Sequence, residues 1–190
     1  MIDEIGDLEG LDIMDVATGV GTTALMLAKR CRSCRVVGLG FEDARLDIAK
    51  ERSRGVKNLE YVKADMDYFG TSTGRFDVAV SSFTIGNFND PIKAIGEMHR
   101  ILKQGGRLFL LDINKPHNRV LNSLWAMNYA LKVNPLLSAG VQKEATYFDI
   151  RRIRVDRDNL VEILKGSGFN VKRVRSLSFG TAFVITAEKI

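Results

Sequence analysis

Residues 11–21 read LDIMDVATGVG, an apolar run that ends in a carboxylate, Asp15, and passes directly into a glycine-bearing turn. Gly19 and Gly21 let the backbone turn tightly and approach a ligand without a Cβ in the way. Asp15 places negative charge at the end of the run, where it suits an ammonium-bearing ligand. The stretch therefore predicts a buried strand, a turn that cradles a nucleoside cofactor, and a helix in succession.

The same glycines leave a nicotinamide cofactor open as an alternative. Gly19, Gly21 and Ala24 satisfy the relaxed G-x-G-x-x-G/A spacing, and an acid, Glu42, follows about 20 residues on. A dinucleotide turn, however, places its first glycine almost at the strand end so that pyrophosphate can enter. Asp15 precedes Gly19 by four residues, so the stretch favours a positively charged ligand.

Length and composition predict one soluble globular domain over residues 1–190, with 45% hydrophobic and 27% charged residues. The N-terminus is acidic and carries neither a secretory signal nor a transit pattern, so we expect a cytoplasmic protein. The longest uncharged stretch, residues 120–131, is too short to span a bilayer. The net charge of +5 is spread along the chain, which makes nucleic acid an unlikely partner.

Cys31 and Cys34 form a C-x-x-C and are the only cysteines. A zinc site needs more ligands, and the two histidines, His99 and His117, lie far off without ligand spacing. A redox motif normally opens a helix, where the thiolate is stabilised, whereas this pair closes one. We therefore expect no metal site and no redox site.

Apolar strands and amphipathic helices alternate along the chain, which is the pattern of βαβ units. Strands are predicted at residues 11–16, 35–39, 59–63, 76–81, 107–113, 170–176 and 181–187. Helices are predicted at residues 22–30, 43–54, 91–102 and 157–165.

Only about four residues join the last two strands, which is too short for a crossover and requires an antiparallel pair. The predicted fold is therefore α/β: a Rossmann-like, mostly parallel seven-stranded sheet with helices on both faces and a C-terminal antiparallel hairpin.

Over nearly its whole length the chain resembles the class I S-adenosylmethionine-dependent methyltransferases, and most closely the ubiquinone/menaquinone biosynthesis C-methyltransferases. Four segments carry the resemblance: DVATGVG at 15–21, VVGLGFEDARLDIAKER at 36–52, FDVAVSSFTIGNFNDPIKAIGEMHRILKQGGRLFLLDINKP at 76–116, and YFDIRRIRVDRDNLVEILKGSGF at 147–169 followed by LSFGTAFVITAEK at 177–189. The cofactor it implies is S-adenosylmethionine, with no metal.

The resemblance also implies site residues. The methionine and ribose portions of the cofactor would be lined by Asp15, Thr18, Gly19 and Gly21. Asp65 and Met66 would flank the adenine, while Ser82 and Phe83 would lie beside the sulfonium. Each of these positions follows a predicted strand, where open α/β sheets bind their ligands. The bland alternatives are a turn-forming Asp65, a core Met66 and an ordinary strand-end Ser82.

Three departures from the family pattern bear on the site. Gly40 stands where the family usually has the acid that binds both ribose hydroxyls; Glu42 is the candidate replacement, and its alternative role is to favour the start of the next helix. Ala17 stands where many relatives have the first glycine of the turn, and we expect it to keep a negative φ. The predicted first strand starts about ten residues in, so the N-terminal lid is short or missing.

On the acceptor side, carbon methylation of a quinol needs a base near neutral pH. The candidates are His117, Asp112 and Tyr147. Asp112 could instead order its loop through backbone hydrogen bonds, and Tyr147 could simply pack. Residues 120–133 carry an apolar helical face that suits a lipophilic acceptor, the sheet core or, less readily, a membrane surface.

The predicted function is methyl transfer from S-adenosylmethionine to a small aromatic or lipophilic acceptor such as a quinol precursor. The alternatives are methylation of RNA or protein, and a non-catalytic S-adenosylmethionine-binding partner subunit. The N/D-P-P-Y signature of amine methylation is absent after the fourth strand, where SSFTIGN stands. Self-association into a homo-oligomer and peripheral membrane contact are left open.

Overall fold

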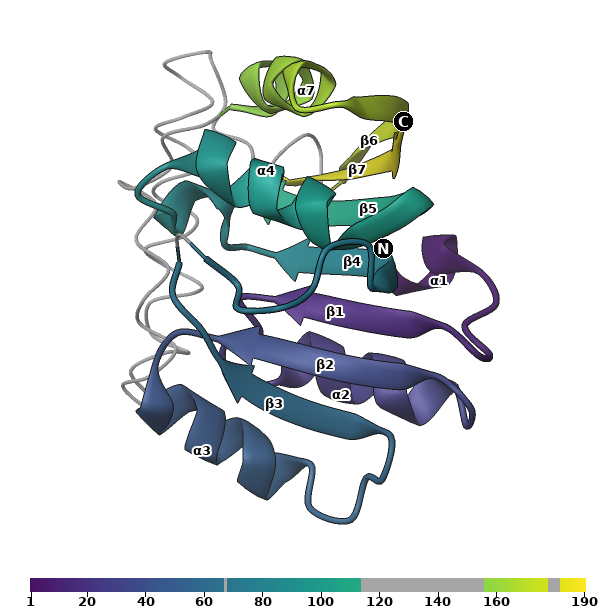
Figure 1. The fold of residues 1–190 in the computed structure, drawn as a ribbon, viewed down its shortest axis with the longest axis vertical. Helices are drawn as coiled ribbons and strands as arrows, with labels where there is room; N and C mark the ends of the chain where they lie inside the picture. The colour runs from purple at the N-terminus through teal and green to yellow at the C-terminus, as the bar shows by residue number, and fades with distance from the viewer. Residues whose placement is uncertain (67, 114–155, 178–181) are drawn as a thin grey trace.

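A seven-stranded sheet organises the computed structural model, which describes residues 1–66, 68–113, 156–177 and 182–190 (Figure 1). The strand order is β3-β2-β1-β4-β5-β7-β6. The strands are β1 (Asp12–Val16), β2 (Arg35–Gly40), β3 (Leu59–Lys63), β4 (Phe76–Ser82), β5 (Leu102–Ile113), β6 (Phe169–Leu177) and β7 (Ala182–Lys189). β1 to β5 are parallel, while β7 pairs antiparallel with both β5 and β6.

Helices cover both faces of this sheet (Figure 1). They are α1 (Ile2–Ile5), α2 (Thr22–Arg30), α3 (Asp43–Arg52), the 3-10 turn η1 (Ile85–Asn87), α4 (Pro91–Ile101) and α7 (Arg157–Gly166). Buried side chains of α4 and α7 share one core with one face of the sheet, and those of α1 and α2 share a second core with the other face. The predicted fold class is confirmed.

The start of α4 shows how local sequence sets an element. Asp90 is the N-cap, and its carboxylate accepts hydrogen bonds from the backbone N–H groups of Ile92 and Lys93 at 3.0 and 3.1 Å. Pro91 occupies the first helical position, where its missing N–H costs nothing. The helix thus begins directly after the loop that follows β4 and holds that loop against the sheet.

The largest difference from the predicted bounds is at the start of β5; the other predicted ends differ by at most two residues, and two short elements were not predicted. β5 begins at Leu102 instead of residue 107, because Leu102 already pairs with Phe76; the next pair is Val78 with Arg107, so residues 103–106 form an irregularity within β5. α1 and η1 were not predicted, since elements of four and three residues are too short to show a helical repeat.

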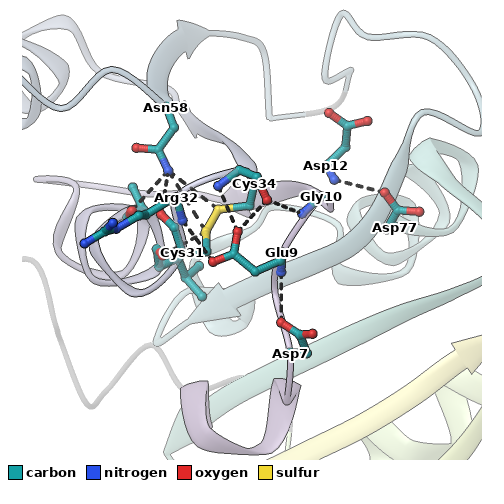
Figure 2. Close-up of a disulfide and its surroundings, with 12 residues drawn as sticks. Asp7, Glu9, Gly10, Asp12, Cys31, Arg32, Cys34, Asn58 and Asp77 are labelled. Carbon is teal, nitrogen blue, oxygen red and sulfur yellow. Dashed lines mark hydrogen bonds between the residues drawn. A yellow bond between two sulfur atoms is a disulfide. The ribbon is translucent and has the colours of Figure 1, made fainter.

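Cys31 and Cys34 form a disulfide between the end of α2 and the start of β2 (Figure 2). Both oxygens of Glu9 accept backbone hydrogen bonds from the turn between the cysteines, from Arg32 at 3.1 Å and Ser33 at 2.9 Å. The sequence did not predict this pairing. α2 begins at the glycine turn and ends at Cys31, so the disulfide lies at the end of α2 away from that turn.

Two features are absent from the described residues. None of their helices is both long and apolar enough to cross a bilayer. Their His, Cys, Asp and Glu side chains form no group of three that could hold a metal ion.

Candidate functional site

The strand order reverses between β1 and β4, and the predicted site residues of the described chain gather at this switch point and on the neighbouring carboxyl ends. From β1 the chain continues to β2 on one side, whereas from β4 it continues to β5 on the other. Open α/β sheets bind their ligands where such connections diverge. Thr23, at the start of α2, donates to the Ser82 hydroxyl at the end of β4 over 3.3 Å and links the two sides.

Asp15 is buried at the end of β1, with only 1% of its surface exposed. Its Oδ2 accepts hydrogen bonds from the Thr18 hydroxyl at 2.6 Å and from the Ala24 N–H at 3.1 Å. Burial raises the pKa of this carboxyl to about 7, although both hydrogen bonds oppose the rise. The side chain therefore ties the turn to the first turn of α2.

The turn that follows Asp15 has an unusual backbone. Gly19 and Gly21 have φ of 55° and 77°, and Ala17 has φ of 60°. The expectation that Ala17 keeps a negative φ is therefore wrong. The turn retains the left-handed conformation that glycine favours, and an L-residue there costs about 1–2 kcal/mol. The Thr18 N–H donates to the Leu39 carbonyl at 2.8 Å and fixes the turn to the end of β2.

The two glycines of the turn meet different surroundings. A Cβ built on Gly21 would lie 2.3 Å from the Tyr61 Oη, so the approach of β3 as well as φ requires glycine there. Among the described residues, a Cβ built on Gly19 would meet only Arg45 Nη1, at 3.8 Å. No other described residue crowds the backbone of Gly19, as a turn that cradles a cofactor requires.

The edge of the site between the glycine turn, the end of β2 and the start of α3 is called the rim. It carries the ion pair of Glu42 and Arg45, and no acid stands at the end of β2. Gly40 ends β2, and a Cβ there would lie 2.5 Å from Leu46 Cδ2, because the Leu46 side chain fills the space. Glu42 is the N-cap residue of α3, but its side chain makes no capping hydrogen bond. Its Oε2 lies 3.3 Å from Arg45 Nε.

Asp65 and Met66 follow β3, and side chains of α4 bond to the backbone a few residues further along. Glu97 accepts a hydrogen bond from the Phe69 N–H at 3.0 Å and pairs through both oxygens with Arg100, at 2.6 and 2.8 Å. Arg100 in turn donates to the Thr71 carbonyl at 2.8 Å. Bidentate carboxylate–guanidinium pairs of this kind hold a fixed geometry. The pair therefore fixes the backbone at Phe69 and Thr71, a few residues after Asp65, and Met66 packs against the core.

Ser82 and Phe83 lie at the carboxyl end of β4. Phe83 has φ of 59°, and 41% of its surface is exposed. Its N–H donates to the Leu111 carbonyl at 2.7 Å, which holds this left-handed residue against β5. A bulky side chain with positive φ is rare and strained.

Of the predicted catalytic candidates, Asp112 is the one that the structure describes. Its two oxygens accept the backbone N–H groups of Ile85 at 3.0 Å and Ile113 at 2.7 Å, so it orders the loop after β4, as the alternative interpretation held. Burial raises its pKa to about 6. His117, Tyr147 and the apolar face at residues 120–133 lie outside the described residues.

Sequence reasoning missed several residues of this site. Charged and hydroxyl residues are common on helix surfaces, and the sequence does not show which of them point toward a site. This applies to Thr23, Arg45, Glu97 and Arg100. Tyr61 alone had a detectable signal, since it pairs with Gly38 in the register of β2 and β3. An aromatic residue opposite a glycine predicts that the ring covers the glycine.

Comparisons with known proteins bear on this geometry. The model of the ubiE/COQ5 methyltransferase family matches residues 1–189. The chain is 31% identical to the demethylmenaquinone methyltransferase of Thermus thermophilus, over 93% of this chain and 82% of that protein. It is 26% identical to the ubiquinone/menaquinone biosynthesis C-methyltransferase UbiE of Shewanella halifaxensis, over 94% of this chain and 74% of that protein. Among solved structures, a SAM dependent methyltransferase from Aquifex aeolicus superposes with a TM-score of 0.77 at 20% identity, covering 100% of this chain and 87% of that one.

Proposed function

We propose that this chain, which belongs to the ubiE/COQ5 methyltransferase family, transfers a methyl group to a ring carbon of a quinol precursor. Family membership makes it an S-adenosylmethionine-dependent methyltransferase; the acceptor is the proposed part. The observation that carries the proposal is the match of family and geometry, since the turn after β1 is open at Gly19 and stands at the switch point. The names of the curated relatives refer to ubiquinone/menaquinone biosynthesis and to demethylmenaquinone, which supports a quinol precursor as the acceptor.

The residues at the switch point fit the cofactor. Gly19 leaves its backbone accessible, and the Asp15 carboxyl, held by Thr18, supplies negative charge for the ammonium and sulfonium of the donor. Asp65 would accept a hydrogen bond from the adenine amine, while Met66 would pack on the purine face. Ser82 and Phe83 would border the reacting methyl group, and Gly21 gives the turn its shape.

S-adenosylmethionine, when bound, supplies a methyl carbon that a positively charged sulfur already activates. The protein therefore has to align donor and acceptor in line and to exclude water. The fixed turn at Gly19 and the segment anchored by Glu97 and Arg100 would hold the donor rigidly, because each is tied by several hydrogen bonds. The exposed Phe83 ring would present an apolar surface to the acceptor.

An acceptor hydroxyl must lose its proton before the ring carbon attacks. The oxygens of Asp112 accept hydrogen bonds from backbone N–H groups, which supports its role in ordering the β4 loop; its role as the base stays a prediction. His117 and Tyr147 stay predictions for the base. Peripheral membrane contact and self-association also stay predictions from the sequence.

The test follows labelled methyl groups from S-adenosylmethionine into extracted lipids, RNA and protein. We expect incorporation into the lipid-soluble fraction alone, and loss of that incorporation in Asp15→Ala. Label in RNA or protein would refute the quinol proposal. S-adenosylhomocysteine should also stabilise the protein against thermal unfolding, whereas NADH should not; the reverse result would restore the nicotinamide alternative.

A further inference from the structure

The ribose side of the site lacks the strand-end acid of the family and holds a charged pair instead. At Gly40 the space for any side chain is taken by Leu46, whose Cδ2 would lie 2.5 Å from a Cβ at position 40. Asp43 pairs with Lys63, and the other charged groups at the start of α3 are Glu42 and Arg45. Both follow the carboxyl end of β2, next to the glycine turn.

Arg45 spans from α3 to that turn. Its Nη1 lies 3.8 Å from the position of a Cβ on Gly19, and its Nε lies 3.3 Å from Glu42 Oε2. Only 24% of the Arg45 side chain is exposed, whereas 55% of the Glu42 side chain is. The guanidinium is therefore packed beside the turn, and the carboxylate stands at the open rim.

The carboxylate next to Glu42 along the chain is paired elsewhere. Asp43 bonds to Lys63 at the end of β3 with 2.5 Å between Oδ2 and Nζ. Since Glu42 makes no side-chain capping bond, its carboxylate is not needed to begin the helix. One side of that carboxylate faces Arg45, and the exposed remainder can accept hydrogen bonds from a ligand.

We propose that Glu42 binds the ribose hydroxyls of the cofactor in place of the missing acid, and that Arg45 is the positioning residue that holds the Glu42 carboxylate at the rim. This rests on the proposed function. A carboxylate two residues beyond the strand end sits on a long side chain, and an unrestrained side chain of this kind loses conformational entropy on binding. The ion pair with Arg45 restricts the Glu42 side chain before the ligand arrives, which reduces that loss.

The test measures binding of S-adenosylhomocysteine by calorimetry. We expect Glu42→Gln to raise the Kd tenfold or more, because charge-assisted hydrogen bonds become neutral ones. Arg45→Met should raise the Kd several-fold, and Arg45→Lys should restore part of that loss. The matched control is the exposed ion pair between Glu51, near the end of the same helix, and Arg54, two residues beyond it, which are also three residues apart; Glu51→Gln and Arg54→Met should leave the Kd unchanged.

A second readout separates ribose binding from a general effect on folding. Adenosine and 2′,3′-dideoxyadenosine compete for the site, and Glu42→Gln should weaken adenosine while leaving the dideoxy compound unaffected. Equal weakening of both compounds, an unchanged Kd in Glu42→Gln, or tighter binding in Arg45→Met would overturn the inference alone. Failure of the wild-type chain to bind S-adenosylhomocysteine would overturn the proposed function as well.

Discussion

Replacement of Asp15 by Asn should separate the stability of this fold from its affinity for the cofactor. The carboxamide oxygen of Asn can accept the same hydrogen bonds from Thr18 and Ala24, now at 2.6 and 3.1 Å. The substitution therefore keeps the size and the acceptor of the side chain and removes its charge. What it removes is the free-energy cost of keeping an ionised carboxylate buried away from water.

The size of that free energy follows from the pKa of Asp15, which burial raises from 3.8 to about 7. One pKa unit corresponds to about 1.4 kcal/mol. Below pH 4 the carboxyl is protonated in both states and costs nothing. Between pH 4 and 7 only the unfolded chain ionises, so stability falls as pH rises, and above pH 7 the folded chain is less stable by up to about 4 kcal/mol. Typical domains have about 5–15 kcal/mol in total.

Urea denaturation of the ligand-free protein at pH 5 and pH 8 measures this cost. We expect the stability advantage of Asp15→Asn over wild type to grow by about 2–3 kcal/mol between the two pH values. Binding of S-adenosylhomocysteine should weaken tenfold or more in the same variant. Asp47→Asn, which removes a carboxyl with 74% exposure on α3, is the matched control. An advantage that does not change with pH would refute the assignment of the buried charge.

Three further substitutions test the backbone and the anchored segment. Ala17→Gly should raise the free energy of unfolding by about 0.5–1 kcal/mol, because relief of the left-handed strain exceeds the entropy of glycine in the unfolded chain; a loss of stability in urea would contradict the φ of 60°. Gly21→Ala should lower it by about 2 kcal/mol or more, since the new Cβ meets Tyr61, and unchanged stability would show that the turn is not fixed. Arg100→Met removes the hydrogen bonds from Arg100 to Thr71 and Thr73 and so loosens the backbone near Asp65. It should raise the KM for S-adenosylmethionine several-fold and leave kcat unchanged; an equal fall in kcat would place Arg100 in the chemical step.

The order and type of the main strands and helices could be predicted from the sequence because buried parallel strands form continuous apolar runs. The short link around residues 178–181 also predicted the antiparallel end of the sheet, and β7 pairs antiparallel with β6. The start of β5 could not be predicted, since K-Q-G-G at 103–106 is typical of a turn. The segment lies within the strand because Leu102 before it and Arg107 after it both pair with β4, with Phe76 and Val78.

The positions of the site could be predicted more readily than its conformations and contacts. Residues that follow strands lie at one edge of a parallel sheet, which placed Gly19, Asp65 and Ser82 together. The φ of Ala17 could not be predicted, because alanine is normally excluded from the left-handed region. The reach of Arg45 toward Gly19 could not be predicted either, since it depends on how α3 packs beside the turn.

The strained backbone of this site lies where a ligand would meet the sheet. Within the ranges that the structure describes, Ala17 and Phe83 are the two non-glycine residues with positive φ, and they follow β1 and β4, the neighbours at the switch point. Strain of about 1–3 kcal/mol at each position persists only where surrounding bonds fix it; here the Thr18 N–H bonds to Leu39 and the Phe83 N–H bonds to Leu111. Both turns are thereby fixed to a neighbouring strand. A replacement that relaxes either turn should gain stability and lose affinity for the cofactor, because the binding conformation would then have to be ordered by the ligand itself.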